Sequence, residues 1–151
     1  MKKLLILLFS IAILSCSKDN DNQPLNFNSQ NLIGRWDLKS RVTGTTVDTL
    51  NSCEELHSGY EFKTNLTCIE GYGRFNINNC TNNQYNQTYS FTNNLLTVRQ
   101  TNGYEARYNI LELSTTKLKM TLTYSKEVNN GAVYEYNPTV NEQQTTSYVK
   151  M

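Results

Sequence analysis

The residue types that could perform chemistry gather in one short stretch of the chain: Cys53, Glu54, Glu55 and His57. A thiolate, two carboxylates and an imidazole can all bind metal ions. Structural zinc sites use four ordered ligands, however, and no second half of such a set follows in the sequence. Glu54 and Glu55 are adjacent, so their side chains point in different directions and make a poor acid and base pair. The stretch therefore predicts a solvated loop, with neither a metal site nor a cofactor.

His57 is the only histidine, which leaves one route to nucleophilic catalysis, a pair of Cys68 with His57. Such a pair requires His57 to fold back beside a thiol that lies in strand-like sequence, and no third residue is indicated that would orient the imidazole. The sequence also lacks a glycine-rich phosphate loop and a G-x-S-x-G motif. We therefore predict that the protein is not an enzyme.

Cys53, Cys68 and Cys80 are the cysteines beyond the N-terminal region, and three thiols allow one bridge and one free thiol. Cys53 and Cys80 both lie in turn-like sequence, whereas Cys68 lies inside a strand-like run. A bridge requires Cα atoms within about 7 Å, which flexible loop ends reach more readily than a residue in the middle of a strand. We favour a Cys53–Cys80 disulfide with Cys68 free, and the other two pairings remain open.

Cys16 stands at the border between a hydrophobic leader and a polar segment. Two lysines precede an apolar run from Leu4 to Leu14, the pattern of a secretory signal peptide, and the run is too short to span a bilayer as a stable helix. The sequence Ile13-Leu14-Ser15-Cys16 resembles the bacterial lipobox, in which the cysteine is acylated and becomes the first mature residue. The alternative is an ordinary buried or disulfide-bonded cysteine. We predict a signal peptide over residues 1–15 and a lipid with acyl chains such as palmitate on Cys16.

Residues 16–30 are predicted to form a disordered tether between the lipid and the folded domain. The segment is rich in Asn, Asp, Gln and Ser and has no apolar period, so it cannot bury enough surface to offset its ordering entropy. About two or three acyl chains would anchor the protein, because one chain binds a membrane only marginally. The segment from Ser17 to Asp21 resembles the acidic signal that sends Bacteroidota lipoproteins to the cell surface. We expect an outer-membrane lipoprotein of the bacterial cell envelope, and the sequence leaves open whether it faces the periplasm or the cell surface.

The charge of the mature chain argues against nucleic acid as a partner. Removal of the leader takes away Lys2 and Lys3, which leaves twelve basic and thirteen acidic residues and a net charge of −1. A near-neutral domain without a basic patch lacks the electrostatic footprint of a nucleic-acid-binding protein. Residues 31–151 are long enough for one domain with a single modest core, which we expect to be monomeric.

Apolar and polar residues alternate with a period of two after the tether. Between Leu32 and Val42 the even positions include Trp36 and Leu38, and the odd positions from Arg35 to Arg41 are charged. One buried face and one wet face are the pattern of an antiparallel strand. The same alternation returns in further segments: Tyr60/Phe62, Phe75/Ile77, Tyr89/Phe91, Leu96/Val98, Tyr108/Ile110, Leu118/Met120/Leu122 and Ala132/Tyr134/Tyr136.

Short polar segments separate these strands and predict tight turns, because Asn and Gly tolerate positive φ. They are Thr64-Asn65, Asn78-Asn79, Asn93-Asn94, Thr101-Asn102-Gly103, Ser114-Thr115-Thr116 and Asn129-Asn130-Gly131. No apolar period of 3.6 extends over about ten residues, so little helix is expected. Short strands joined by tight turns form an antiparallel meander, and closure into a small barrel of about eight strands removes its exposed edges. The predicted fold class is all-β.

Aromatic residues supply the candidate binding site. Five tyrosines lie on predicted strands, mostly in phase with apolar neighbours: Tyr60, Tyr89, Tyr108, Tyr134 and Tyr148. Sites for amphipathic ligands use such ring faces and hydroxyls. We predict a ligand-binding pocket formed by Phe62, Tyr89, Phe91, Tyr108, Met120 and Tyr134. The alternative is that tyrosines fill and cap a small barrel.

Gly34-Arg35-Trp36, at the start of the first strand, resembles the G-x-W motif of lipocalins, in which the tryptophan closes one end of the barrel. Downstream, NQTYSFTNNLLTV and ARYNILELSTTKLKMTL are similar to the lipocalin-like domains common in Bacteroidota lipoproteins. The resemblance extends from Leu32 to Tyr124. It implies structural roles for Gly34 and Trp36 and a non-enzymatic protein that binds a small apolar or amphipathic ligand. The second function considered is a filled barrel whose loops or edge contact a protein or glycan partner at the cell surface.

The sequence departs from the classical lipocalin pattern in three respects. It lacks the Thr-Asp-Tyr loop motif, an arginine near the C-terminus that would cover Trp36, and room for a long flanking helix. These departures indicate a small relative, and small barrels are often filled by their own side chains. An enclosed cavity of at least about 300 Å³ would favour ligand binding over the second function.

Overall fold

The computed structural model describes residues 27–76 and 79–151, so the predicted signal peptide, Cys16 and most of the predicted tether lie outside the described residues. The described elements are, in chain order, η1 (Ser29–Leu32), β1 (Gly34–Thr43), β2 (Thr46–Asp48), α1 (Ser52–His57), β3 (Gly59–Phe62), β4 (Thr67–Asn76), β5 (Asn79–Thr92), β6 (Leu95–Arg99), β7 (Glu105–Leu113), β8 (Lys117–Asn129), β9 (Ala132–Tyr136) and β10 (Gln144–Lys150). No helix among them is long and apolar enough to cross a membrane.

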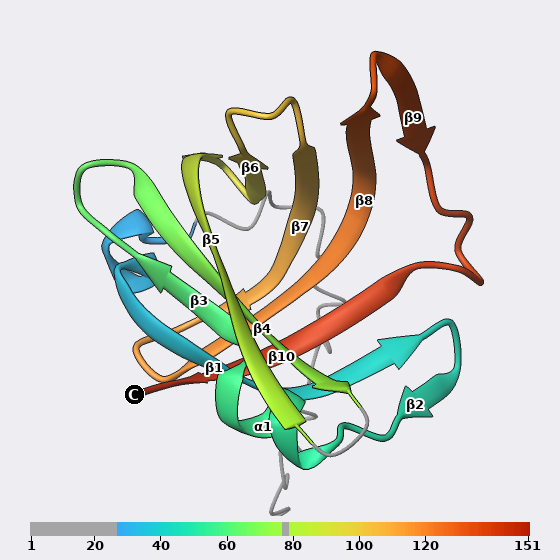
Figure 1. Ribbon diagram of the computed structural model, residues 1–151. Coiled ribbons are helices and arrows are strands. Elements are labelled where there is room, and N and C mark those ends of the chain that lie inside the picture. Colours follow the sequence, from blue (N-terminus) through green and yellow to red (C-terminus); the bar gives the residue numbers. More distant parts are fainter. Residues whose placement is uncertain (1–26, 77–78) are drawn as a thin grey trace, which may run out of the picture.

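Eight of the ten strands form a closed antiparallel ring (Figure 1). The strand order is β10-β1-β3-β4-β5-β6-β7-β8, and β10 closes the ring by pairing with β8 as well as with β1. The other two strands lie outside the ring, because β2 pairs with β1 and β9 pairs with β8. The predicted all-β meander, closed into a barrel of about eight strands, is confirmed.

The turns between strands have the backbone geometry that their residues predict. Asn93 has a φ of 57° in the β5–β6 turn, and Asn130 and Gly131 have φ values of 51° and 81° in the β8–β9 turn. Positive φ at both central residues is the geometry of a tight hairpin turn of type I′, which favours Asn-Gly. The short polar segments of the sequence therefore make the turns that place β5 beside β6 and β8 beside β9.

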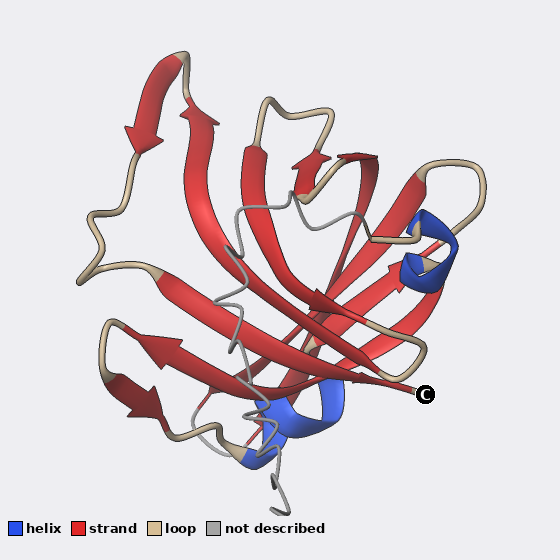
Figure 2. Ribbon diagram, turned by 180° about the vertical axis from the view of Figure 1, so that it is seen from behind, coloured by secondary structure: helices blue, strands red, loops and turns tan. Residues whose placement is uncertain are grey.

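Figure 2 shows η1 and the C-terminus on the same side of the barrel. Trp36 closes that end, because it lies between Leu32 of η1 and Lys150 of β10. Its ring is fully buried, and its indole Nε1 donates a hydrogen bond of 2.7 Å to the carbonyl oxygen of Leu32. The ammonium of Lys150 lies 5.1 Å from the ring centroid and donates to the carbonyl oxygen of Asn31 at 3.0 Å. A lysine from the last strand thus covers the ring where no arginine is available. Gly34 has a φ of +123°, and a Cβ there would lie 2.8 Å from the Lys150 side chain.

The folded domain begins earlier than the sequence predicted. Asn28 caps η1 by accepting a hydrogen bond from the backbone of Gln30, and Phe27 packs against the hydrophobic core. Residues 27–30 therefore belong to the domain and not to the tether. The prediction was wrong because a single aromatic residue and a short 3-10 turn produce no apolar period.

A β-bulge in β1 changes which of its residues face the interior. The pairing with β10 shifts register between Leu38 and Ser40, and an extra residue in a strand reverses the phase of the side chains beyond it. Arg41, predicted on the wet face, therefore lines the barrel interior. Val42, predicted on the apolar face, pairs with Val47 of β2.

Two further predicted apolar segments are exposed. Phe75 near the end of β4 is 54% exposed, and Tyr134 of β9 is 62% exposed. Every other residue of β9 is exposed as well. Both segments extend beyond the ring. Side chains that would face the interior there have no opposite strand to pack against. The predicted interior position of Tyr134 is therefore wrong.

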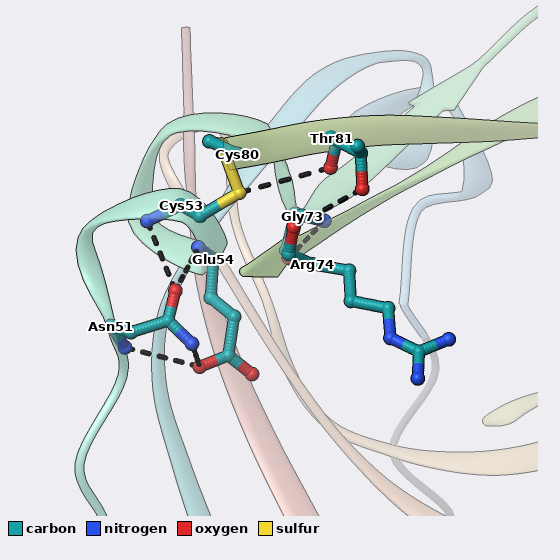
Figure 3. The surroundings of a disulfide bond; sticks show 8 residues. Asn51, Cys53, Glu54, Gly73, Arg74, Cys80 and Thr81 are labelled. Carbon is teal, nitrogen blue, oxygen red and sulfur yellow. Dashed lines mark hydrogen bonds between the residues drawn. A yellow bond between two sulfur atoms is a disulfide. The ribbon is translucent and has the colours of Figure 1, made fainter. Parts of the chain in front are cut away.

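A disulfide between Cys53 and Cys80 fastens α1 to β5 (Figure 3), and Cys68 is free; both agree with the prediction. The thiol of Cys68 is buried. The Cα atoms of Cys53 and Cys80 are 5.4 Å apart. Cys80 lies on a strand and not in a loop, because the polar run that opens β5 pairs fully with β4. Gly73 of β4 permits the close approach of α1, since a Cβ there would overlap the carbonyl oxygen of Cys53.

We predict that the substitution Trp36→Ala lowers the free energy of unfolding by about 3–5 kcal/mol, because it leaves a cavity at the closed end of the barrel. Trp36→Phe should cost less, since it keeps most of the apolar volume but leaves the Leu32 carbonyl without its donor. Chemical denaturation measures both effects. The control Tyr134→Ala, at an exposed aromatic residue, should change stability by about 0.5 kcal/mol or less. Near-wild-type stability of Trp36→Ala would contradict the closing role of this ring.

Candidate functional site

The half of the barrel interior next to Trp36 is filled by its own side chains. Phe62 stacks on Tyr60 with ring centroids 5.3 Å apart and contacts Tyr89 edge-on at 5.1 Å. Close packing of this kind is typical of protein cores. The fully buried side chains of this half are apolar: Trp36, Phe62, Leu96, Val98, Ile110, Leu118 and Met120.

The other half of the interior, toward the β1–β2 and β8–β9 hairpins, contains a recess with polar walls. Its volume is 110 Å³. Strands β1, β3, β4, β7 and β10 each contribute inward-facing side chains, because these strands converge where β10 closes the ring. The residues that matter most for its chemistry are Leu38, Arg41, Tyr60, Glu70, Tyr108 and Tyr148.

Hydrogen bonds connect the polar groups of this recess. The hydroxyl of Tyr60 donates to Glu70 Oε1 at 3.0 Å, and the Nε2 of Gln87 donates to Glu70 Oε2 at 2.9 Å. The hydroxyls of Tyr60 and Tyr108 are 3.3 Å apart, and the thiol of Cys68 lies 3.7 Å from Gln87 Oε1. No side-chain oxygen or nitrogen buried in the described residues lacks a partner. The cluster is therefore a satisfied network centred on one carboxyl group.

Burial shifts the pKa values of this cluster. Burial raises the pKa of Glu70 above its usual value, although the hydrogen bonds from Tyr60 and Gln87 act in the opposite direction. Burial and the nearby charge of Glu70 raise the pKa of Cys68 and of Tyr104 to about 12. The phenols and the thiol consequently stay neutral near pH 7, and Glu70 is the group of the cluster whose charge changes most readily.

The predicted pocket residues do not lie together. Tyr108 lines the recess, whereas Phe62 and Met120 belong to the filled half. Tyr89 and Phe91 line a separate hollow of 170 Å³ beside η1 at the closed end. The hydroxyl of Tyr89 donates to the carbonyl oxygen of Lys63 at 2.8 Å, so it supports a turn there.

Sequence analysis missed Glu70 and Gln87, which form the centre of the network. Glu70 follows Cys68 by two positions in a strand-like run, and a period of two places both on the same face. Gln87 stands in the same relation to Tyr89 on β5. The spacing of two from Cys68 and from Tyr89 could therefore have placed both residues on the inner face. A search for alternating apolar residues passes over a polar residue at such a position.

Two of the residues first considered as metal ligands have structural roles instead. Asn51 caps α1 by accepting hydrogen bonds of 3.0 Å from the backbone of Cys53 and of Glu54, and Glu54 Oε2 accepts from the Asn51 backbone at 3.0 Å. Glu54 Oε1 also accepts from Arg41 Nη2 at 2.8 Å, and Arg41 donates to Asp48 at 3.0 Å. Burial alone would raise the pKa of Glu54, but the hydrogen bonds from Asn51 and Arg41 lower it.

The outer surface has a larger hollow than the interior. It has a volume of 540 Å³ and lies where β5 separates from the turn after β6. Its walls include the buried Cys68 and Gln87, and most of the others come from the residues that alternate with these two, from the end of β6 and from the β6–β7 turn: Thr67, Ile69, Asn86, Thr88, Arg99 and Thr101.

We predict that Glu70→Gln changes how stability depends on pH. The folded-state pKa of Glu70 is raised, so the folded chain holds this proton more tightly than the unfolded chain does. The stability contributed by the protonated acid is present at low pH and is lost as pH rises from the unfolded value through the folded one. Thermal scans at a series of pH values measure the difference in Tm between the wild type and Glu70→Gln. As pH rises through this range, the Tm of the wild type should fall relative to that of the variant. The control Glu61→Gln, exposed on β3, should follow the wild type. Parallel profiles for wild type and Glu70→Gln would contradict the prediction.

The match to a protein family agrees with the closed ring of strands. A family model described as a lipocalin-like domain matches residues 32–120. No match is found among curated proteins. Among solved structures, a bovine odorant-binding protein, a deswapped triple mutant, is 14% identical with a TM-score of 0.42, over 80% of this chain and 74% of that protein. Because the family match spans more than half of the sequence, the chain belongs to the lipocalin-like domain family.

Proposed function

We propose that this protein is a lipid-anchored lipocalin-like protein of the bacterial cell envelope. In this proposal it binds a small amphipathic molecule and catalyses no reaction. The observation that supports ligand binding is the recess at the open end of the barrel, where polar groups of Tyr60, Glu70 and Tyr108 stand above an apolar core. A few positioned polar groups beside apolar surface are typical of small-molecule sites.

The size of the recess limits what it can enclose. Pockets for drug-sized ligands measure about 300–1,000 Å³. This recess measures 110 Å³, so it falls below the size that would by itself favour ligand binding over the interaction module. It can therefore enclose a very small molecule, or the polar end of a larger one whose remainder lies in the mouth of the barrel. Of the two ligand classes that the sequence predicts, apolar and amphipathic, this volume and the polar walls favour the amphipathic one.

Export and anchoring are supported by two features of the chain. The hydrophobic leader ends at Cys16 in a lipobox-like sequence. The Cys53–Cys80 disulfide suits an oxidising compartment outside the cytoplasm. Together they favour an outer-membrane lipoprotein, with the orientation toward periplasm or cell surface still open.

The outer hollow supports the second candidate function, an interaction module. Its 540 Å³ exceed the volume of the interior recess, and its walls combine Ile69 with polar and basic side chains. Under this function the barrel acts as a rigid frame, and a protein or glycan partner contacts the surface over β4 and β5. Ile69→Glu should weaken such contacts and leave the interior recess unchanged.

We predict that Cys16→Ala yields a protein that is neither acylated nor cleaved by the lipoprotein peptidase, because the acylated thiol is the cleavage signal. Metabolic labelling with a fatty-acid probe, together with the electrophoretic mass of the product, measures both events. The control Cys68→Ala removes the buried free thiol and should retain the label. Persistent labelling of Cys16→Ala would show that the lipid is attached elsewhere.

We predict that a small molecule co-purifies with the wild-type protein and is lost in the variant Thr146→Leu. Thr146 is buried in the wall of the recess, so a leucine there would occupy the ligand volume. Native mass spectrometry of protein extracted in mild detergent detects the bound mass. The control Ser147→Leu places the same side chain at the next position of β10, which faces the other way. Retention of the molecule by Thr146→Leu, or its absence from all three proteins, would contradict the proposed recess.

A further inference from the structure

Glu70 is a partly buried acid, and both of its carboxyl oxygens accept hydrogen bonds. Tyr60 donates to one carboxyl oxygen at 3.0 Å and Gln87 donates to the other at 2.9 Å. When Glu70 is ionised, the single hydroxyl proton of Tyr60 points to it, and Tyr108 is then the donor in the 3.3 Å contact between the two tyrosines. In that state the donors converge on the carboxylate.

No cationic side chain among the described residues pairs with Glu70. The ion pairs found there involve Arg35, Arg41, Arg99 and Arg107 with other acids. Arg41 faces the same recess, but its guanidinium is neutralised by Asp48 and Glu54. Each other group facing Glu70 from the surrounding strands is neutral near pH 7: Tyr60 on β3, Cys68 on β4, Gln87 on β5, Tyr108 on β7 and Tyr148 on β10, with Tyr104 just before β7.

A buried carboxylate without a counter-ion is unfavourable, and two events can relieve it. Either the acid takes up a proton, or a cation enters the site. The recess beside Glu70 is lined by the rings of Tyr60, Tyr108 and Tyr148, and aromatic rings attract cations. The rings of Tyr60 and Tyr148 meet edge to face with centroids 5.9 Å apart, so their planes enclose a corner of the recess.

We propose that the recess binds the ammonium group of a small amine, with Glu70 as its counter-ion and the rings of Tyr60, Tyr108 and Tyr148 around it. This inference rests on the proposed function, in which the open-end recess holds a small ligand. A volume of 110 Å³ accommodates an ammonium group with a short alkyl chain. A carboxylate ligand would be repelled by Glu70. A metal ion is disfavoured because the described residues contain no group of three ligating side chains.

The proposal gives amine binding a pH dependence. The amine pairs with the ionised form of Glu70, so binding displaces the proton that the buried acid otherwise holds. Affinity for the amine should fall by up to about tenfold for each pH unit below the pKa of Glu70. A simple alkylamine stays protonated over this range, as a lysine side chain does. A neutral alcohol of the same length should show no such dependence.

The test uses the full chain in a non-ionic detergent and three probes of equal length: n-butylamine, n-butanol and butyrate. Isothermal titration at pH 8 and at pH 5, against a detergent blank, should show the amine binding most tightly and losing affinity at the lower pH. Glu70→Gln should reduce amine affinity at pH 8 by at least about tenfold and leave butanol binding unchanged. The control Glu61→Gln, exposed on the same wall, should behave as the wild type does.

A measurement on the wild type makes the test independent of how Glu70→Gln folds. In protein with ¹³C-labelled glutamate, a pH titration by NMR should show one carboxyl group whose pKa is raised. Saturation with butylamine should lower the pKa of that group, because binding and ionisation are reciprocal. An unchanged pKa, or butanol and butyrate binding as tightly as the amine, overturns the amine site but leaves a small-ligand function standing. Failure of all three probes to bind, together with no co-purifying molecule, overturns both.

Discussion

The double pairing of β10 is the contact on which the rest of the structure depends. It joins the first strand of the ring to β8 and so converts an open meander into a closed ring, in which only the short outlying strands β2 and β9 keep a free edge. Only after closure does the alternation of side chains define an inside and an outside. Closure also brings Lys150 over the ring of Trp36 at one end and Tyr148 against Tyr60 in the middle. The closed end and the recess are thus two results of one strand pairing.

The interior that closure creates has two halves with opposite energetics. Each fully buried side chain such as Phe62 or Ile110 stabilises the barrel by about 1.5–3 kcal/mol. Burial of Glu70 acts against stability, and its hydrogen bonds to Tyr60 and Gln87 offset only part of the loss of hydration. A protein selected for stability alone would place an apolar residue there. The departure from that rule supports the proposal that the recess is the ligand site.

Much of the fold follows from patterns local to the chain. A period of two located most of the strands, Asn and Gly located the turns, and the strand-like context of Cys68 left Cys53 and Cys80 as the bridge. The recess was less predictable, because its composition depends on register. A bulge that no residue type predicts turned Arg41 inward. Pairing of β3 with β4 places Tyr60 opposite Glu70, and closure of the ring by β10, a contact between distant segments, adds Tyr148 to them. The exposure of Tyr134 has the same cause, since its strand continues past the last point at which the ring has an opposite wall.

The disulfide encloses more than the helix that it fastens. The covalent loop from Cys53 to Cys80 contains all of β3 and β4, the two strands that hold Tyr60 and Glu70. Reduction of the bridge would restore conformational freedom to this wall of the recess while leaving the other walls intact. If the recess binds a ligand as proposed, binding free energy and redox potential are coupled: a molecule that orders this wall makes the bridge harder to reduce, and reduction weakens the binding of that molecule by the same factor. The protein would then release its ligand more readily in a reducing environment than in an oxidising one.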